Sequence, residues 1–443
     1  MRRLVAGSKN FSHDIESLRS FDLLDDEVLD KKVSQVLMNV RRKGDSALLD
    51  YINEFESQDL KAVLDSRVDM GTLASSWDRL STSEQDVLTL AINRVESFHR
   101  HQIESSWSYV DEQENRLGQQ VTPIKRVGVY VPGGRASYPS TTLMTVIPAQ
   151  VAGVSEIAVV TPVGESNQND FLFGALYKLG IEEVYGFGGA QAIAALAFGT
   201  ESIPKVDKIV GPGGLYVTAA KRKVFGYVGI DSIAGPTELV VIADNSAPID
   251  WVVLDLLSQA EHDPSAQSLL ISADSEYTDS VLKRIDEVLP SFSREQIIRQ
   301  SLESRGAAIE VVDLDQAIEI SNVIAPEHLQ LCVKAPRELL PKVSNAGAIF
   351  CGNYASEAFG DYLAGPSHVL PTFGSSRFSS PLGVYDFVKK SSLVEMSKVG
   401  AMSLSKPAFL FAKSEGLEAH ALASKARGED LGSNIFEFDC KVD

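Results

Sequence analysis

The chain has 443 residues, of which 44% are hydrophobic and 23% charged, and its formal net charge is −19. This length and composition are ordinary for a soluble globular protein of two or three domains, and the acidic balance argues against nucleic acid or an anionic membrane as the main partner. No apolar run is as long as a membrane span, so we expect no membrane segment. No apolar run follows the two arginines near the start, so we expect no secretory signal.

Residues 1 to about 120 are predicted to be mostly helical. The stretches LMNVRRKGDSALLDYINEFES and VLTLAINRVESFHRHQIESSW carry apolar residues at helical spacing. His99 and His101 fall in the second stretch, among Arg, Gln and Glu neighbours. We therefore expect both histidines to lie on the solvated surface.

From Arg126 onward, short apolar runs closed by turn signals, such as EIAVVTPV, alternate with helical patterns such as NQNDFLFGALYKLG. This alternation is typical of a parallel α/β sheet. It forms two blocks, one near 127–236 and one from 237 to about 370. After PTFGSSRFSSPLG the strand signal fades, and two helical patterns are predicted to close the chain.

Glycine turns follow three strands of the first block. They are Pro132-Gly133-Gly134, Gly186-Phe187-Gly188-Gly189 and Gly211-Pro212-Gly213-Gly214. Ligands of open α/β sheets bind outside the carboxyl ends of strands, where glycine lets backbone N–H groups approach a phosphate at a helix N-terminus. None of the three turns is a full dinucleotide fingerprint, so ordinary βα turns that need positive φ remain the alternative.

Histidine is sparse, with seven in the chain. Four of them lie in the second half, each beside an acidic or turn-forming residue: His262, His328, His368 and His420. A protein that uses histidine so sparingly and groups four in this way is predicted to be building a site, although each one taken singly fits a structural role as well.

The stretch LLSQAEHDP contains His262 at the end of a predicted helix. Gln259, three residues earlier, shares the face of His262, whereas the adjacent Glu261 points about 100° away. Gln is an unusual zinc ligand, and two residues do not fill a coordination shell. The other ligands must come from elsewhere in the chain, and Asp361 and His420 are candidates that composition alone does not select.

Glu327 and His328 are adjacent, at a point where a helix gives way to a β-rich segment. Histidine can accept a proton near neutral pH, and a buried glutamate can deprotonate a water molecule. The pair is therefore a candidate for acid–base catalysis, with a solvated loop pair as the alternative.

Several long motifs of this chain, in this order, resemble the histidinol dehydrogenase family from about Gly44 to His420. They are VGVYVPGGRASYPSTTLM, GGAQAIAALAFGTESIPKVDKIVGPG, AGPTELVVIAD, DLLSQAEHDP, APEHLQL, GDYLAGPSHVLPT and EGLEAH. The resemblance implies NAD-dependent oxidation of L-histidinol through L-histidinal to L-histidine, the last step of histidine biosynthesis. It also implies one zinc ion per site and a homodimer whose sites are shared between subunits.

The resemblance implies two Rossmann-like parallel α/β domains with helical extensions at both ends, intertwined in the dimer. The expected parts are an N-terminal arm (1–28), a helical part of the first α/β domain (29–126), a second, NAD-side α/β domain (127–236), the remainder of the first domain with the zinc and catalytic residues (237–380), and a helical tail reaching the partner subunit (381–443).

The site residues are carried over from the matching motifs. Gln259, His262, Asp361 and the partner subunit's His420 match the zinc ligands, and Glu327 and His328 match the catalytic pair. The substrate-binding positions comprise the zinc ligands and His328 together with Thr237, His368 and Glu415, the last reaching across the dimer. Tyr130, Gln191 and Gly214 match the positions that contact NAD.

Two positions depart from the family pattern. The family usually has Asn where this chain has Gly214, so a side-chain hydrogen bond to the dinucleotide is lost while backbone contacts can survive. The family usually has Ser where this chain has Thr237, which keeps the hydroxyl. Because the matched zinc and catalytic positions are retained, the resemblance argues against a non-catalytic paralogue.

The resemblance suggests a mechanism in which zinc holds the amino and imidazole nitrogens of histidinol, His328 accepts the alcohol proton, and Glu327 activates water to hydrate the aldehyde. Cys332, Cys351 and Cys440 lie in no matched motif and form no metal-binding spacing, so we expect no thiohemiacetal step. Their odd, sparse count is typical of a reducing cytoplasm.

Two other functions remain open at this point. A zinc- and NAD-dependent dehydrogenase of another small primary alcohol fits the departures at Gly214 and Thr237. A zinc hydrolase fits the His, Glu and Asp residues, although the absence of HExxH and the presence of several glycine turns speak against it.

Overall fold

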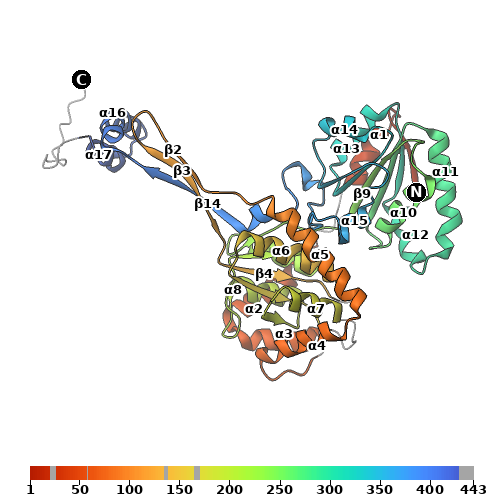
Figure 1. Ribbon diagram of the computed structural model, residues 1–443, viewed down its shortest axis with the longest axis horizontal. Coiled ribbons are helices and arrows are strands. Elements are labelled where there is room, and N and C mark those ends of the chain that lie inside the picture. The colour runs from red at the N-terminus through yellow and green to blue at the C-terminus, as the bar shows by residue number, and fades with distance from the viewer. Residues whose placement is uncertain (20–25, 57, 134–137, 164–169, 429–443) are drawn as a thin grey trace. The chain divides into compact units, whose positions relative to one another are not determined.

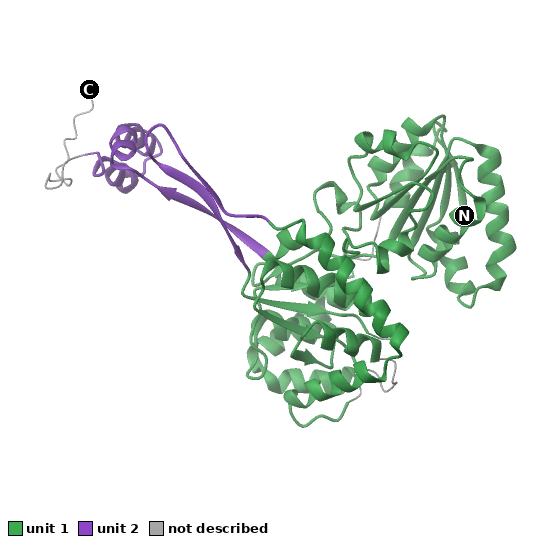
Figure 2. Cartoon of the chain, viewed as in Figure 1, with its two compact units in different colours: residues 1–103, 124–387 green, residues 104–123, 388–443 purple. Residues whose placement is uncertain are grey.

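A computed structural model describes residues 1–19, 26–56, 58–133, 138–163 and 170–428 (Figure 1). The chain divides into two compact units (Figure 2). Unit 1 comprises residues 1–103 and 124–387, and unit 2 comprises residues 104–123 and 388–443. None of the described helices is both long enough and apolar enough to cross a membrane.

The middle of the chain builds a five-stranded parallel sheet in the order β6-β5-β4-β7-β8. Its strands are β4 (Arg126–Tyr130), β5 (Glu156–Val160), β6 (Glu183–Tyr185), β7 (Lys208–Val210) and β8 (Gly229–Ile230). The connecting helices are α6 (Pro139–Ala152), α7 (Asp170–Lys178), α8 (Gly189–Phe198) and α9 (Leu215–Val224). Strand order reverses between β4 and β7, so the carboxyl ends of these two strands form a topological switch point.

The second block builds a six-stranded parallel sheet in the order β1-β11-β10-β9-β12-β13. Its strands are β1 (Arg2–Val5), β9 (Glu238–Ala243), β10 (Gln267–Ser272), β11 (Ala307–Glu310), β12 (His328–Cys332) and β13 (Ala348–Cys351). Its helices are α1 (Phe11–Arg19), α10 (Ile249–Ala260), α11 (Ser275–Val288), α12 (Glu295–Ser304), α13 (Leu314–Ile324), α14 (Pro336–Leu339) and α15 (Glu357–Tyr362). Strand β9 is buried along its whole length, as expected when helices cover both faces of a parallel sheet.

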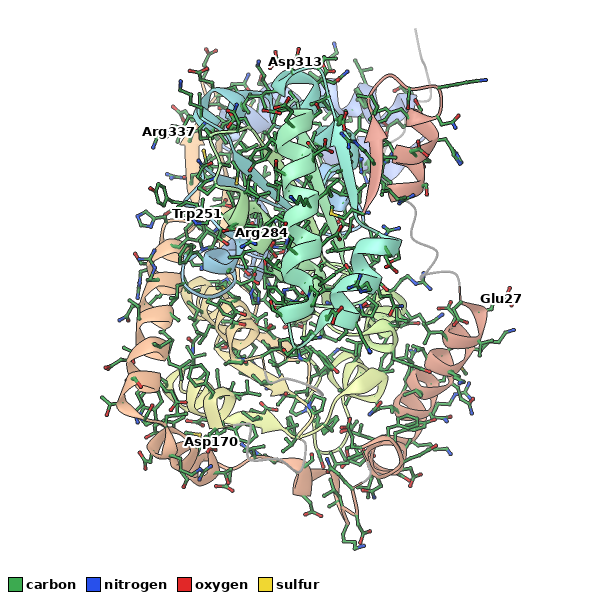
Figure 3. All side chains as sticks on the ribbon, turned by 90° about the vertical axis from the view of Figure 1, so that its right-hand side faces the viewer. Glu27, Asp170, Trp251, Arg284, Asp313 and Arg337 are labelled. Carbon is green, nitrogen blue, oxygen red and sulfur yellow. The ribbon has the colours of Figure 1, made fainter. Side chains whose placement is uncertain are left out.

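Several helix ends are fixed by side-chain caps. The Asp313 carboxyl, labelled in Figure 3, accepts the backbone N–H of Gln316 at 2.8 Å and starts α13. Ser81 and Glu84 form a capping box at the start of α5 (Thr82–Arg100). Short 3₁₀ segments complete the connections at Val63–Ser66, Leu289–Ser291, Leu340–Lys342, Ser375–Arg377 and Val384–Phe387.

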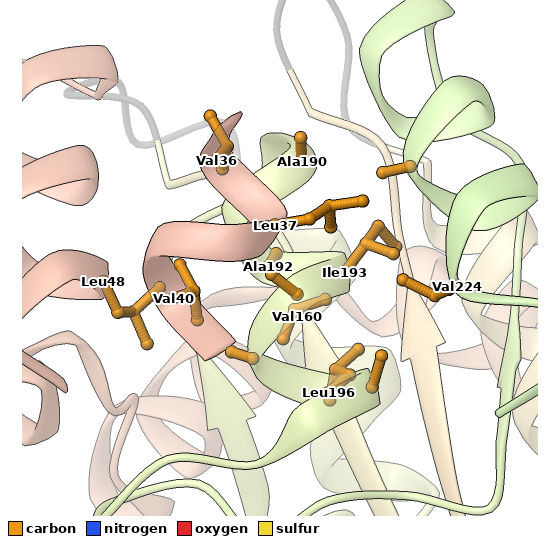
Figure 4. Packing of buried hydrophobic residues seen from close by; sticks show 14 of the residues in the cluster. Val36, Leu37, Val40, Leu48, Val160, Ala190, Ala192, Ile193, Leu196 and Val224 are labelled. Carbon is orange, nitrogen blue, oxygen red and sulfur yellow. The ribbon is translucent and has the colours of Figure 1, made fainter. Parts of the chain in front are cut away.

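The helices predicted to complete the zinc-bearing domain lie elsewhere. α2 (Glu27–Lys43) and α3 (Asp45–Phe55) pack in one core with α8 of the five-stranded sheet, and Figure 4 shows Val36, Leu37 and Val40 of α2 beside Ile193 and Leu196. α4 (Met70–Arg79) and α5 pack with α6 and α7 of the same sheet. An amphipathic pattern shows that a helix covers a core, but it does not show which core. The prediction that the helices of 29–126 belong to the zinc-bearing domain was therefore wrong, because α2 to α5 cover the five-stranded sheet.

The N-terminal arm also has a definite place. β1 pairs in parallel with β11, and Leu4, Ile15 and Leu18 are buried in the core of the six-stranded sheet. Residues 1–19 are therefore part of the domain that carries most of the predicted zinc and catalytic residues.

The described residues of unit 2, which are 104–123 and 388–428, form three antiparallel strands in the order β14-β3-β2 and two helices. The elements are β2 (Trp107–Val110), β3 (Arg116–Pro123), β14 (Val388–Glu395), α16 (Lys398–Ser414) and α17 (Glu418–Lys425). The predicted wholly helical tail thus begins with a strand. The sequence VKKSSLVE lacks a clear alternation of polar and apolar residues, and β14 forms because all eight of its residues pair with β3, which is distant in the chain.

Candidate active site

A cavity of about 520 Å³ in unit 1 receives loops from both parallel sheets. From the five-stranded sheet come the turns after β4 and β7, including Pro132 and Gly214. From the other sheet come Thr237, Glu327 and His328, which lie at the amino ends of β9 and β12. Ligands of open α/β sheets bind at the carboxyl ends of strands, and this rule holds for the five-stranded sheet only. The six-stranded sheet lines the cavity with the amino ends of its strands.

His328 begins β12 and is 3% exposed. Its Nδ1 atom lies 3.0 Å from the backbone oxygen of Glu238. Because a carbonyl oxygen can only accept, Nδ1 carries the proton and Nε2 has a free lone pair. Burial lowers the pKa of His328 to about 3, so the imidazole is neutral and can accept a proton at Nε2.

Glu327 is buried beside His328, and burial raises the pKa of its carboxyl well above the ordinary value. Its Oε2 atom accepts the Thr237 hydroxyl at 2.6 Å and the Glu238 N–H at 3.0 Å. The His328 Nδ1 atom lies 3.6 Å from the same oxygen, but burial keeps the imidazole neutral, so the contact is not an ion pair. Thr237 thus holds the carboxyl in place, as a serine hydroxyl could.

The LLSQAEHDP helix ends earlier than predicted. α10 ends at Ala260, Glu261 is its C-terminal cap, and His262 lies one residue beyond. The helical face that Gln259 was predicted to share with His262 therefore ends before His262. The backbone N–H of His262 still donates to the backbone oxygen of Gln259 at 3.4 Å. Gln259 is fully buried, its Nε2 donates to the Thr237 hydroxyl at 2.7 Å, and its Oε1 has no hydrogen-bond partner. Such an orphaned buried oxygen fits a metal ligand or a bound donor.

Three side chains have ligand atoms that lie within 4.8 Å of one another: His262, Glu357 and Asp361. Burial raises the pKa of both carboxyls, to about 6 for Asp361. His262 and Asp361 were predicted to bind a metal, whereas Glu357 was not predicted at all. The available signal was the spacing in EAFGDY, because residues four apart on α15 share one face.

His368 lies next to this group. Its Nδ1 donates to the backbone oxygen of Asp361 at 3.0 Å, and its Nε2 can accept the Thr141 hydroxyl at 3.3 Å. Burial lowers the pKa of His368 to about 4, so the ring is neutral. Thr141 comes from α6, so His368 links the loop after α15 with the five-stranded sheet.

Tyr130 and Gln191 lie near the carboxyl ends of the five-stranded sheet. The Tyr130 hydroxyl accepts the Gly189 N–H at 3.2 Å, and burial raises its pKa. Gln191 is buried in the first turn of α8 and lines a second cavity of about 810 Å³. These two residues are therefore close to the same glycine turn, whereas Gly214 lines the first cavity.

Two turn glycines differ in what they require. Gly211 has φ +108°, and a Cβ there would clash with the Tyr130 backbone oxygen. The turn itself therefore requires glycine at this position, whether or not a ligand binds there. Gly214 has φ −67°, and a Cβ there would have no atom within 4 Å. A side chain at position 214 is thus sterically permitted. Gly134, in the first of the three turns, lies outside the described residues.

Glu415 and His420 belong to unit 2, whereas the other predicted site residues belong to unit 1. Both line one hollow of about 760 Å³, formed by α16, α17 and the turn between them. The structure thus brings these two residues together on one face of unit 2.

The predictions for the cysteines and for His99 and His101 can be compared with the structure. Cys332 is buried, and burial raises its pKa to about 12, which fits a structural role; Cys440 lies outside the described residues. His101 is exposed, as expected. His99 is fully buried, its Nδ1 donates to the Val95 oxygen at 2.8 Å, and burial lowers its pKa, so the surface prediction for it was wrong.

Comparison with known proteins places the whole chain beside one family. A sequence profile of the family described as "Histidinol dehydrogenase" matches residues 22–428. The chain is 49% identical to a histidinol dehydrogenase of Chromobacterium violaceum, over 97% of this chain and 99% of that one. It is 47% identical to one of Pseudomonas fluorescens, over 97% and 98%. A crystal structure of histidinol dehydrogenase from Elizabethkingia anophelis superposes with a TM-score of 0.90 at 34% identity, covering 96% of this chain and 98% of that chain.

Proposed function

This chain belongs to the histidinol dehydrogenase family, and we propose that it oxidises L-histidinol through L-histidinal to L-histidine, the last step of histidine biosynthesis, with NAD as hydride acceptor. The observation that carries the proposal is the cavity in which Glu327, His328 and Asp361 meet, in a chain that matches the family along nearly its whole length.

The residues around Gln259 fit a zinc ion. Gln259 offers an oxygen without a partner, and His262 and Asp361 offer a nitrogen and an oxygen in one small group. We assign these three residues, with His420 of the partner subunit, as the zinc ligands. When bound, zinc would hold the amino and imidazole nitrogens of histidinol and fix the reacting carbon in place.

His328 acts as the base. Its Nε2 accepts the hydroxyl proton of histidinol while a hydride leaves the same carbon for NAD, which yields the aldehyde. The bond from Nδ1 to the Glu238 backbone oxygen fixes the ring and its tautomer, so the lone pair of Nε2 stays available.

Glu327 acts in the second half of the reaction. Its buried carboxyl, with a raised pKa, can take a proton from the water that adds to the aldehyde. His328 returns its first proton to the carbonyl oxygen as the water adds, and it then accepts a hydroxyl proton of the hydrated aldehyde as a second hydride leaves for a second NAD. Thr237 supports both halves because its hydroxyl contacts Glu327 and Gln259.

The remaining predicted residues bind the two ligands. His368 lines the cavity and contributes to the substrate pocket, and Glu415 of the partner subunit reaches the substrate. Tyr130, Gln191 and Gly214 contact NAD near the carboxyl ends of the five-stranded sheet. The glycine turns and helix N-termini there suit an anionic cofactor.

We propose that the active form is a homodimer located in the cytoplasm. Unit 2 exposes many large apolar side chains: Trp107, Tyr109, Val110, Leu393, Val394, Met396, Val399, Met402, Leu404, Leu410, Phe411 and Leu417. An apolar surface of this kind marks an interaction site. A second copy of the chain is the occupant that would also carry Glu415 and His420 to the zinc-bearing cavity. The free thiols of Cys332 and Cys351 are in keeping with a reducing compartment.

The test is the yield of NADH per molecule of L-histidinol, measured before and after removal of metal with a chelator. We expect two NADH per histidinol, loss of turnover after chelation and recovery with zinc. No turnover of histidinol by the zinc-loaded protein would contradict the proposal and favour the alternative, oxidation of another small primary alcohol.

A further inference from the structure

Lys221 of α9 and Asp231, which follows β8, form a buried ion pair for which neither the sequence patterns nor the family resemblance gave a role. Their side chains are 2% and 3% exposed, and the Lys221 Nζ atom lies 2.5 Å from the Asp231 Oδ1 atom. Burying two charges is costly, and apolar side chains of similar volume are often no less stable in their place. Stability alone therefore does not explain this pair.

The ion pair holds the glycine turn after β7 through both backbone groups of Gly211. The Asp231 Oδ2 atom accepts the Gly211 N–H at 2.7 Å, and Lys221 donates from Nζ to the Gly211 oxygen at 2.8 Å. Gly211 has φ +108°, which is a conformation that only glycine adopts readily. Two charged side chains thus keep the backbone of this turn in one conformation.

The glycine turns after β6 and β7 differ in their free N–H groups. In the turn after β6, the N–H groups of Gly188 and Gly189 donate to protein side chains, at 3.0 Å and 3.2 Å. In the turn after β7, no acceptor among the described residues takes the N–H of Gly213 or Gly214, and both glycines line the cavity of unit 1. Free N–H groups at the start of a helix suit a phosphate, so the turn after β7 is the better of the two for an anionic cofactor.

We propose that Lys221 and Asp231 are positioning residues for NAD, because they fix the turn after β7 with the N–H groups of Gly213 and Gly214 directed to the phosphates of the dinucleotide. The inference rests on the use of NAD proposed above. A turn that is fixed in advance does not have to be ordered when the cofactor binds, so less of the binding free energy is lost.

Equilibrium titration of the purified full-length protein with NAD tests the proposal. We expect Lys221→Met to raise the Kd for NAD about tenfold, because the Gly211 oxygen loses its charged donor and the turn is no longer fixed. The KM for NAD should rise by a similar factor. The kcat at saturating NAD should change little, since the turn binds the cofactor in the ground state and the transition state alike.

A double variant separates positioning from stability. Lys221→Met alone leaves the Asp231 carboxylate buried without a cation, which destabilises the fold. Lys221→Met combined with Asp231→Asn removes both charges and keeps an acceptor for the Gly211 N–H, so it is expected to fold with a higher Tm than the single variant. Its Kd for NAD should stay raised, because the Gly211 oxygen still lacks a donor.

Arg126→Met is the matched control. Arg126 is also a buried cation of the five-stranded sheet, and it pairs with Glu183 at 2.6 Å. It begins β4, so it lies at the amino end of that strand, away from the glycine turns at the carboxyl ends. We expect Arg126→Met to lower the Tm and to leave the Kd for NAD as in the unmodified protein.

Amide hydrogen exchange without NAD reports on the turn itself. In a peptide covering residues 211–214, the N–H of Gly211 is the one that donates a hydrogen bond, and it must leave Asp231 to exchange. We expect this peptide to exchange faster in Lys221→Met and in the double variant than in Arg126→Met.

The outcomes distinguish this inference from the proposed function. Unchanged NAD affinity in both Lys221 variants, or an affinity that recovers with the Tm in the double variant, overturns the inference even if histidinol is oxidised. An equal loss of affinity in Arg126→Met also overturns it, because the effect is then a general loosening of the sheet. If the unmodified protein binds no NAD, the proposed function fails, and faster exchange at Gly211 still supports the hold of the pair on the turn.

Discussion

The hydroxyl of Thr237 donates a 2.6 Å hydrogen bond to the carboxyl of Glu327. The same hydroxyl accepts a bond of 2.7 Å from Gln259, whose other side-chain atom, Oε1, is left for a ligand. One hydroxyl therefore orients both a proposed catalytic carboxyl and a proposed zinc ligand.

Replacing Thr237 with Val removes this hydroxyl while keeping the shape of the side chain. A hydrogen bond to a charged group contributes about 1.5–3 kcal/mol, so we expect kcat to fall about 10- to 100-fold. Thr237→Ser keeps the hydroxyl and is expected to retain most of the activity. Steady-state kinetics of the two variants decide the matter, and equal activity in both would contradict a role for the hydroxyl.

Replacing Gly214 with Asn is expected to tighten NAD binding. The backbone at Gly214 accepts any residue, a Cβ there meets open space, and the position lines the cavity. One added hydrogen bond contributes about 0.5–1.5 kcal/mol, which corresponds to a decrease in Kd of about 2- to 10-fold. Titration of both proteins with NAD measures the change. A weaker affinity in the variant would show that position 214 does not face the cofactor.

The buried carboxyl of Glu238 is expected to make stability depend on pH. Burial raises its pKa to about 7 from the ordinary value of 4.5, and its Oε1 accepts the Phe373 N–H at 3.0 Å. The folded protein thus binds a proton that the unfolded chain has lost. This contribution is complete below pH 4.5 and disappears as the pH rises through about 7.

Glu238→Gln should remove this dependence, because glutamine stays neutral. Thermal melting of metal-free protein is measured from about pH 5 to about pH 8, and the Tm of the variant relative to the original protein should rise with pH. The effect is a few kcal/mol at most, since one pKa unit corresponds to about 1.4 kcal/mol. A constant difference in Tm would mean that Glu238 does not titrate in this range.

Turnover is expected to survive removal of the cysteines. The high pKa of the buried Cys332 thiol leaves it without the thiolate that a nucleophile needs. A chain with Cys332, Cys351 and Cys440 replaced by alanine or serine should still give two NADH per histidinol. If a folded variant stops at the aldehyde, the second oxidation proceeds through a cysteine thiohemiacetal and not through the hydrated aldehyde.

A mixture of two inactive variants should regain activity if the site is shared. A Glu327→Ala chain lacks the carboxyl in its own cavity, and a His420→Ala chain lacks the residue given to the partner. Each heterodimer then contains one intact site. Activity is measured after unfolding and refolding the mixed chains and purifying the heterodimer by two affinity tags. Verified heterodimers without activity would place His420 in the cavity of its own chain.

Most of the candidate site residues could be predicted from the sequence. The motifs supplied Glu327, His328 and Asp361, which all line the cavity of unit 1. They also supplied Gln259, which donates to Thr237 of that cavity and whose Oε1 has no hydrogen-bond partner. Helical spacing selected Gln259 and His262 through a helix that in fact ends at Ala260. Glu357 was not predicted, because its four-residue spacing to Asp361 has a meaning only once both are known to lie on one helix.

The sequence by itself determined the alternation of strands and helices, the glycine turns and the groups available for chemistry, because these depend on side-chain periodicity and on local backbone conformation. Only the tertiary structure decided that α2 to α5 cover the five-stranded sheet, that β14 pairs with β3, and that the second sheet presents the amino ends of β9 and β12 to the cavity. An apolar face or a strand has no intrinsic partner. The partner is selected by the packing of all elements at once, so these contacts between residues distant in the sequence could not be derived from any one segment.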